Sequence, residues 1–586
     1  MHLFDAVPDP PVEETASMNA ISRRVPVCLP ADLPEGFEVM SFLGVDYCHV
    51  KTVDGGDLYL TRYGVRLWKQ LLPENWYERE WFEANRERLE GTSRVYRVPT
   101  RQVEGMALDL VVKFSRVGEV VPVDTLTVNQ FVNAEFNSPF EEFSLLMELR
   151  AGRTGPRGIH ILTQRPMAIY VPSKRLQLWQ TGRSEDKINA KIAQHPGVEI
   201  DILRQYVVLF SWVKGLDAVE TADYLRLRGR HRARFLSQAN HLVIHELEQK
   251  GYRVVDMKPQ HIILRPQPDG SLLRDRNRQF VYSLIDYELL QRTQEHEQMV
   301  RNATRRFYLR HMAHRFNHGR SKPMPAHLKA VQVMGVDYVT GHAQSTGGLL
   351  WVVGKDPDLF NFFLPERWRR TPKQRLSEVN QVCYTQTKDN VNLVWRVSRM
   401  GDPALSADSE KRRSAVLEHG YNSPFEEFSL AMELTRSGLK TVYPRAIYQT
   451  GSQRDATRVL VDERRMLVMA DLKTPEGGVV LSSDRDYITV WGFWNGPDEL
   501  LAMDEKRRYW GVDVASAQAK GLLDAGQVQA LMRMVADRMA LAGIEDLDPK
   551  PDHLLISFDA NCRLVLDDEG LPEVRLCSFE LLRRIG

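Results

Sequence analysis

The stretch that decides the fold is Asn137-Ser138-Pro139-Phe140-Glu141-Glu142-Phe143-Ser144-Leu145-Leu146-Met147-Glu148-Leu149, because it occurs twice. It returns as Asn422-Ser423-Pro424-Phe425-Glu426-Glu427-Phe428-Ser429-Leu430-Ala431-Met432-Glu433-Leu434, identical at twelve of thirteen positions. Shorter pairs recur at similar offsets: Gly44–Tyr47 with Gly335–Tyr338, Pro73–Trp76 with Pro365–Trp368, and Asp256–His261 with Asp548–His553. A period of about 290 residues is too long for a solenoid repeat, so the chain is predicted to contain a duplicated domain.

Length and composition fit two domains of ordinary size. The 586 residues include 78 basic and 77 acidic ones, so no global field attracts the chain to nucleic acid or to a membrane surface. Five scattered cysteines without a CxxC pair indicate reduced thiols and a cytoplasmic location. No apolar run has the length of a membrane span, and the N-terminus lacks the features of a secretory signal.

The sequence divides into four parts. Residues 1–31 are rich in proline and acidic residues and are expected to form a mobile tail. The first copy is expected over 32–318 and the second over 324–586, joined by the short polar linker 319–323. In each copy, segments rich in β-branched and aromatic residues come first and longer helices later, which predicts an α+β class with two lobes per copy.

The repeated stretch is predicted to begin a helix at the same residue in both copies. Ser138 is a good N-cap, Pro139 suits the first helical position, and Glu141 stands where a capping box needs its acid. Glu142 is not used by that cap, and apolar residues follow it at the spacing of a buried helix face. A carboxylate there needs a partner, as does the alternative candidate Glu148, which also recurs.

Five further segments follow in an order that is typical of one family. They are Val111-Val112-Lys113, Glu142 in the helix, Val208–Gly215, Val255–Leu264 and Leu284-Ile285-Asp286-Tyr287-Glu288. In this order, with apolar strands between them, the first copy resembles the protein-kinase-like fold over most of its length. The Asp-x4-His spacing of Asp256 and His261 is similar to that of lipopolysaccharide core sugar kinases.

The resemblance implies an enzyme that transfers a phosphoryl group from ATP with the help of Mg²⁺. The implied site consists of Lys113 and Glu142 at the phosphates, Ser211 and Val213 beside adenine, Asp256 and Lys258 at the acceptor hydroxyl, and Asp286 and His261 at the metal.

The sequence departs from the family at several points. No GxGxxG is present, Val254 and Val255 replace the His and Arg of the usual HRD triplet, and His261 replaces the metal-binding Asn. About thirty residues follow Asp286 in the first copy, which leaves no room for a full substrate-binding lobe. Both C-terminal lobes are therefore expected to be shortened, and a peptide acceptor is not expected.

The second copy has lost two of the implied functional residues. Arg396 stands in place of Lys113 and Ser578 in place of Asp286, so the phosphate ammonium and the metal carboxylate are both missing. The second copy is therefore predicted to be a pseudokinase. We expect Glu142 to face Lys113 and Glu427 to face Arg396.

Other interpretations of these residues stay open. Lys113 and Glu142 are also compatible with a structural ion pair, in which case the whole chain is an inactive scaffold that binds a protein partner. His311, His314 and His318 are spaced to share one helix face, either as metal ligands or as part of a basic surface. The arginine-rich runs 226–234 and 305–315 suit nucleic acid, a solvated surface or a contact between the copies, which are expected to pack as one body.

Overall fold

The protein is described here from a computed structural model. The structure describes residues 29, 33–89, 94–115, 136–156, 158–174, 204–275, 280–317, 324–369, 371–377, 382–404, 407, 409–451, 462–473, 477–496, 509–567 and 570–585. These residues form two compact units. The first contains described residues of 1–304 and 325–327, and the second those of 305–324 and 328–586. The expected tail 1–31, apart from residue 29, and the expected linker 319–323 lie outside the described residues.

The first unit is built on an antiparallel sheet with the strand order β1-β2-β3-β8-β9-β6-β5-β4. Its strands are β1 (Glu38–Phe42), β2 (Val45–Lys51), β3 (Asp57–Leu60), β4 (Glu87–Arg88), β5 (Val95–Pro99), β6 (Asp109–Phe114), β8 (Pro166–Val171) and β9 (Val207–Ser211). One face of this sheet packs on Trp76 and Phe82, which come from the helical connection between β3 and β4. Side chains alternate along β6, so Leu110 and Val112 join this core and Lys113 points to the other face.

Two smaller sheets complete the first unit. One has the order β10-β12-β13-β7, and the other pairs β11 with β14. Their strands are β7 (Leu162–Thr163), β10 (Leu216–Asp217), β11 (Tyr252–Val254), β12 (Ile262–Leu264), β13 (Tyr282–Leu284) and β14 (Leu290–Arg292).

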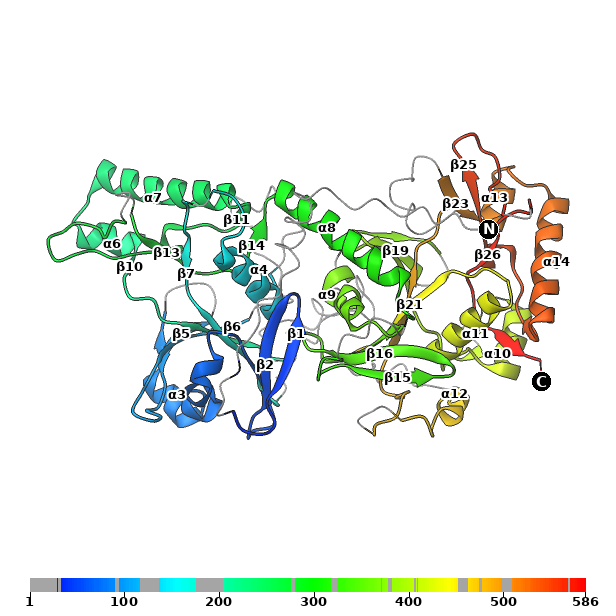
Figure 1. Ribbon diagram of the computed structural model, residues 1–586, viewed down its shortest axis with the longest axis horizontal. Coiled ribbons are helices and arrows are strands. Elements are labelled where there is room, and N and C mark those ends of the chain that lie inside the picture. Colours follow the sequence, from blue (N-terminus) through cyan, green and yellow to red (C-terminus); the bar gives the residue numbers. More distant parts are fainter. Residues whose placement is uncertain are drawn as a thin grey trace. The chain divides into compact units, whose positions relative to one another are not determined.

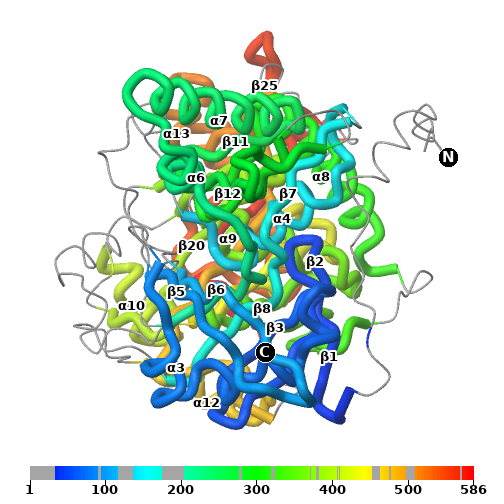
Figure 2. Tube along the Cα trace, turned by 90° about the vertical axis from the view of Figure 1, so that its left-hand side faces the viewer, coloured from blue at the N-terminus to red at the C-terminus, as the bar shows by residue number. Residues whose placement is uncertain are grey.

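The helices of the first unit follow its sheets. They are η1 (Val65–Leu67), α2 (Trp68–Leu71), η2 (Pro73–Asn75), α3 (Arg79–Asn85), α4 (Pro139–Ala151), α6 (Ala218–Tyr224), α7 (Gly229–Gln249) and η5 (Pro259–His261). Figures 1 and 2 both show α4 between the strands of the large sheet and α7. The helix that carries the repeated sequence is therefore central to its unit.

The second unit repeats the strand order of the first, as β15-β16-β17-β21-β22-β20-β19-β18. These strands are β15 (Lys329–Val333), β16 (Val336–Ala343), β17 (Gly348–Val353), β18 (Lys373–Arg375), β19 (Val382–Gln386), β20 (Asn392–Val397), β21 (Tyr443–Gln449) and β22 (Tyr487–Gly492). Two smaller sheets contain β23 (Tyr509–Asp513), β24 (Ile544–Asp546), β25 (Leu554–Asp559), β26 (Arg575–Leu576) and β27 (Leu582–Arg584).

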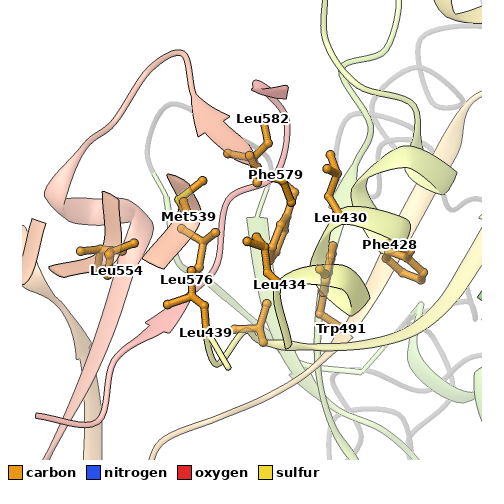
Figure 3. Close-up of a cluster of buried hydrophobic side chains, with 14 of the residues drawn as sticks. Phe428, Leu430, Leu434, Leu439, Trp491, Met539, Leu554, Leu576, Phe579 and Leu582 are labelled. Carbon is orange, nitrogen blue, oxygen red and sulfur yellow. The ribbon is translucent and has the colours of Figure 1, made fainter. Parts of the chain in front are cut away.

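Most helices of the second unit occupy places in the chain that correspond to helices of the first. The helices of the second unit are η7 (Pro357–Phe363), α9 (Pro365–Trp368), α10 (Glu410–His419), α11 (Pro424–Arg436), α12 (Arg464–Val468), α13 (Val514–Ala519), α14 (Ala525–Leu541) and η9 (Pro551–His553). Figure 3 shows how α11 joins the core of this unit, with Leu430 and Leu434 beside Phe579 and Leu576. Trp491 of β22 stacks on Phe579 with ring centroids 5.0 Å apart.

The repeated short motifs make the same contacts in both units. The β1–β2 turn at Leu43-Gly44 and the β15–β16 turn at Met334-Gly335 have positive φ at both residues, the conformation of a tight hairpin turn. Ser144 Oγ donates to the Leu43 carbonyl at 2.6 Å, and Ser429 Oγ donates to the Met334 carbonyl at 2.8 Å. The duplication predicted from sequence is thus visible in the contacts as well as in the strand order.

Each unit is mixed α/β with mainly antiparallel sheets, which agrees with the predicted α+β class. Helix α8 (Gln294–Ala313) contains the boundary between the units, which falls after Thr304. In the part of the chain that the structure describes, no helix is both long and apolar enough to cross a membrane.

Candidate functional site

Two strand pairings bring distant loops of the first unit together. β11 pairs with β14, and β12 pairs with β13, all antiparallel. The loop from Val255 to His261 joins β11 to β12, and the turn from Ile285 to Leu289 joins β13 to β14. Because each loop is anchored at both ends by the same two pairings, the two loops must lie side by side. Ile285 N–H donates to the His261 carbonyl at 2.9 Å, which closes this arrangement.

Lys113 lies among three carboxylates at this place. Its Nζ is 2.6 Å from Asp286 Oδ1, 3.2 Å from Glu288 Oε2 and 3.9 Å from Glu142 Oε1. The side chains of Lys113, Glu142 and Glu288 are less than a tenth exposed, whereas that of Asp286 is 31% exposed. Asp286 is therefore the carboxylate of this group that a ligand from solvent can most easily reach.

Burial and charge shift the pKa values of Lys113, Glu142 and Asp286 differently. Burial alone would lower the pKa of Lys113, but Asp286, Glu142 and Glu288 raise it above its ordinary value. Burial raises the pKa of Glu142 to about 7. For Asp286, burial is outweighed by Lys113 and His261, so its pKa is lowered to about 2. At neutral pH, Asp286 is thus the firmly ionised partner of Lys113.

The backbone at Asp286 is unusual. Its φ is +66°, in the left-handed region that few residues other than glycine adopt. Ser578, at the same place in the second unit, has no such φ although the structure describes it. Strained backbone is retained where the surroundings fix it, often at functional sites.

The loop residues predicted for the acceptor and the metal lie beside this cluster. Lys258 Nζ is 2.8 Å from Asp256 Oδ2, and His261 Nε2 is 3.7 Å from Asp286 Oδ2. Burial lowers the pKa of His261, so its imidazole is neutral near pH 7. The structure thus brings His261 next to Asp286, while Asp256 is paired with its own neighbour Lys258.

The segment predicted to lie beside adenine leaves the sheet after β9. Ser211 makes two hydrogen bonds with Arg165. Its N–H donates to the Arg165 carbonyl at 3.0 Å, and its Oγ accepts from Arg165 N–H at 3.1 Å. Val213 is half-buried and lies in no helix or strand. Gly215 follows, and a Cβ there would lie 2.4 Å from the Leu264 carbonyl oxygen, so the segment packs directly on β12.

The first residue of the repeated stretch holds the turn that carries Asp286. Asn137 N–H donates to the Glu288 carbonyl at 2.9 Å, and its Nδ2 donates to the Leu290 carbonyl at 2.9 Å. Asn422 makes the same two bonds to Glu580 and Leu582, both at 2.8 Å. Each repeated helix therefore positions a turn that is 150 or more residues away in the chain.

An aromatic contact reinforces this connection in both copies. The ring centroid of Phe143 in α4 lies 5.4 Å from that of Phe210 in β9. The Phe210 centroid lies 5.7 Å from that of Tyr287 in the turn. In the second unit Phe428, Trp491 and Phe579 follow the same order.

The predicted contacts of Glu141 and Glu142 on the repeated helix are confirmed, and the alternative candidate Glu148 does not face Lys113. Glu141 completes a capping box with Ser138, and Glu142 faces Lys113. Glu148 instead accepts from Tyr252, His296 and Arg292, the last at 2.6 Å. These groups hold the pKa of Glu148 well below its ordinary value despite burial. Glu148 belongs to a separate structural network.

The equivalent place in the second unit contains a buried network of opposite charges. Arg396 bonds Glu427 and lies 2.8 Å from Glu580 Oε1, so Glu427 faces Arg396 as predicted. Arg412 of α10 contributes a second guanidinium, which bonds Glu580 and lies 3.2 Å from Asp548. Arg412 comes from a segment outside the repeated stretch, so sequence comparison of the copies did not reveal it.

Glu288 was also missed as a member of the cluster. A signal was present, because Asp286-Tyr287-Glu288 corresponds to Ser578-Phe579-Glu580 and only the glutamate is identical. An acid retained next to a lost aspartate indicates a contact that both copies need.

The predicted histidine face is wrong, because α8 ends at Ala313 and His314 lies in the following turn, while His318 lies outside the described residues. His311 instead groups with Asp356 and Asp358, whose ligand atoms lie within 4.8 Å of one another. Asp356 also caps η7, where its side chain accepts from Asp358 N–H, and His311 Nδ1 lies 2.5 Å from Asp356 Oδ2. These contacts account for the group as a capped helix end with a histidine partner.

No family model matches the chain, and no curated protein matches it.

Proposed function

We propose that the first copy is a protein-kinase-like domain that binds ATP with Mg²⁺ and transfers its γ-phosphoryl group, and that the second copy is a pseudokinase. The observation that carries this proposal is the position of Lys113 Nζ, within 3.9 Å of three carboxylates that come from a helix and a distant turn. A buried ammonium beside a reachable carboxylate is suited to orient phosphate oxygens and a divalent cation together.

The charges of the cluster fit a metal–nucleotide ligand. The described residues place one ammonium, Lys113, among Glu142, Asp286 and Glu288. Glu142 Oε1 is buried and accepts no hydrogen bond from the described residues. Burying a carboxylate with incomplete pairing is costly, and a divalent cation relieves that cost. Carboxylate oxygens are also the ligands that Mg²⁺ prefers.

Each residue of the first copy then has a separate task. Lys113 binds the phosphates, Asp286 holds the cation with His261 beside it, and the half-buried segment at Val213 borders the base. When bound, Mg²⁺ neutralises charge that develops on the phosphate oxygens. Asp256 accepts the proton of the acceptor hydroxyl as that oxygen bonds to phosphorus and ADP leaves.

The test is a thermal-shift measurement on the full-length chain with Mg·ATP. Lys113→Ala and Asp286→Asn are each expected to abolish the stabilisation, which amounts to about 2.7 kcal/mol at a ligand concentration 100 times Kd. Glu142→Gln is expected to weaken binding, because Lys113 loses an ionisable partner. The matched variants Glu427→Gln and Asp548→Asn in the second unit are expected to leave the Mg·ATP shift intact.

Undiminished stabilisation of both Lys113→Ala and Asp286→Asn would exclude this site. If the substitutions abolish the stabilisation, transfer of labelled γ-phosphate to a small hydroxyl compound distinguishes an enzyme from a domain that only binds nucleotide.

A scaffold without phosphoryl transfer is the second candidate. It is supported by the repeated helix, whose Asn137 and Asn422 make matching structural bonds although the residues of the two clusters differ. Absence of any Mg·ATP stabilisation in the wild-type chain would favour this candidate, with a protein as its partner.

A further inference from the structure

The junction between α6 and α7 in the first unit carries a dense group of arginines. Residues 224–234 contain no acid and five arginines, Arg226, Arg228, Arg230, Arg232 and Arg234. Figures 1 and 2 both show α6 beside α7. Arg232 Nε lies 3.2 Å from Asp223 Oδ1, which holds the start of α7 against the end of α6. The formal charge of the whole chain is only +1, so this positive charge is local.

Four of these arginines have no acidic partner. Arg226, Arg228, Arg230 and Arg234 are exposed, and none of them makes an ion pair with any residue that the structure describes. Arg230 and Arg234 are also four residues apart on one helix, where like charges repel each other. Positive charge that the chain does not balance itself favours an anionic partner.

The second unit shows the same turn without arginine. After α6, the N–H groups of Arg226 and Leu227 each donate to a carbonyl of that helix at 2.9 Å, and after α13 those of Gly521 and Leu522 do the same at 2.9 and 3.0 Å. Arg226 therefore stands where the second unit has Gly521. Their φ values are +53° and +71°, in the left-handed region that suits glycine and is costly for arginine.

The start of the next helix repeats this contrast. In the second unit Asp524 caps α14, and its side chain accepts from Gln527 N–H at 2.8 Å. Arg228 precedes α7 at the corresponding place and makes no side-chain cap bond, and the first turn of α7 contains no acid. At two positions, the first unit thus has an arginine where its duplicate has the residue that local structure prefers. Such departures are expected where a sequence serves binding.

An exposed ring beside the arginines narrows the class of partner. Tyr224, the last residue of α6, is 52% exposed. Arginine forks bind phosphate oxygens through paired hydrogen bonds, and an exposed aromatic ring stacks on an unpaired base. An acidic peptide has no base for the ring, and a duplex keeps its bases stacked on one another. The combination therefore fits a single strand.

We infer that Tyr224, Arg226, Arg228, Arg230 and Arg234 form a surface that binds single-stranded nucleic acid, with the arginines on phosphates and the tyrosine on a base. Contacts of this kind carry little sequence preference. The inference does not rest on the proposed function, because none of these residues belongs to the cluster around Lys113.

The test is the fluorescence anisotropy of labelled oligo(U) and oligo(dT) titrated with the full-length chain at several salt concentrations. Four phosphate contacts predict that the logarithm of the binding constant falls against that of the salt concentration with a slope of about −3. The double variant Arg226→Gly/Arg228→Asp gives the first unit the residues of its duplicate. It is expected to raise the melting temperature and to lower the affinity at least tenfold. Because stability and affinity move in opposite directions, misfolding cannot account for this result.

Single variants separate the ring from the charges. Tyr224→Ala is expected to weaken binding at least fivefold without changing the salt slope, whereas Arg230→Gln is expected to reduce the slope by about 0.7. Arg533→Gln removes an exposed arginine of α14 in the second unit and is the matched control, with binding like wild type. Lys113→Ala is also expected to bind like wild type, which keeps this surface distinct from the nucleotide site.

Binding of either strand supports the inference, and the tighter one identifies RNA or DNA as the ligand. Failure of the wild-type chain to bind both strands at low salt, or wild-type affinity in the double variant, would overturn it. Equal affinity for a DNA duplex, with no effect of Tyr224→Ala, would reject a single strand. Tighter binding of polyglutamate than of oligo(U), lost in the double variant, would assign the surface to an acidic protein instead.

Discussion

A single glutamate position shows how burial and charge compete in this protein. Glu142 and Glu427 occupy the same place on the repeated helix, and each faces a cation from a strand. Burial nevertheless raises the pKa of Glu142 to about 7 and that of Glu427 to about 8. In each case, folding favours the protonated acid, because desolvation outweighs the attraction of the cation.

The sign of the resulting pH dependence follows for Glu427. Its folded pKa is raised, so the stabilisation is fully present below the unfolded value near 4.5 and is lost as pH rises toward 8. Glu427→Gln is expected to flatten the decline of unfolding free energy between pH 5 and 8, by up to about 1.4 kcal/mol per pH unit. Urea unfolding of the full-length chain at several pH values measures this slope.

An unchanged slope in Glu427→Gln would show that Glu427 stays ionised with Arg396 throughout that range. Glu580 provides an internal check, because its pKa is lowered by Arg396 and Arg412 in spite of burial. The stabilisation that ionised Glu580 provides is lost only as pH falls below the ordinary glutamate range. It therefore does not affect the slope between pH 5 and 8.

At the scale of the element, the start of α4 performs two distinguishable tasks. Ser138 caps the helix, whereas Asn137 holds the turn through its backbone N–H, which donates to the Glu288 carbonyl, and its side-chain Nδ2, which donates to the Leu290 carbonyl. The first task is local, and the second connects the helix to a strand pair far along the chain. Although the two residues are neighbours, substituting each one alone separates the effect on helix stability from the effect on site geometry.

Ser138→Ala is expected to cost about 1 kcal/mol of stability, the usual effect of losing an N-cap, with little change in Mg·ATP affinity. Asn137→Ala is expected to cost about 1–3 kcal/mol, because the Leu290 carbonyl loses its side-chain donor while the backbone bond to Glu288 remains, and to weaken Mg·ATP binding as well. Chemical denaturation and the ATP thermal shift provide the two readouts. Equal effects of both variants on nucleotide affinity would argue against a positioning role for Asn137.

Local and distant parts of this fold differ in how well the sequence predicted them. The helix start at Ser138, the strands around Lys113 and the pairing of Glu142 with Lys113 follow from short-range patterns or from one resemblance. Arg412 was not predictable, because its contacts with Asp548 and Glu580 span more than 130 residues and its segment lies outside the repeated stretch.

At the scale of the whole molecule, the second unit begins before its repeat does. Tyr308 and Met312 of α8 are buried, and Tyr308 packs on Phe362 and Phe363 of η7 with ring centroids 5.3 and 6.1 Å apart. A fragment that starts at 324 lacks these side chains and leaves the two phenylalanines without their cover. That the two copies pack as one body stays a prediction.

Fragment 294–586 is therefore expected to be more stable to heat than fragment 324–586. The reason is the apolar area that Tyr308 and Met312 bury, since a fully buried large side chain contributes about 1.5–3 kcal/mol. Differential scanning calorimetry of both fragments tests this. Tyr308→Ala in the longer fragment is the control, and it should lower the melting temperature most of the way to that of the shorter fragment. Equal melting temperatures of the two fragments would place α8 outside the second unit.

The guanidinium of Arg412 also has a consequence for the surroundings in which each copy keeps its shape. A cation that is covalently part of the chain cannot be diluted, exchanged or removed by a chelator. The second unit therefore keeps its charge balance at any concentration of free divalent ions. Under the proposed function, the first unit does not, and its stability rises and falls with the supply of Mg²⁺. One polypeptide would then contain an ion-responsive domain next to an ion-independent duplicate of itself.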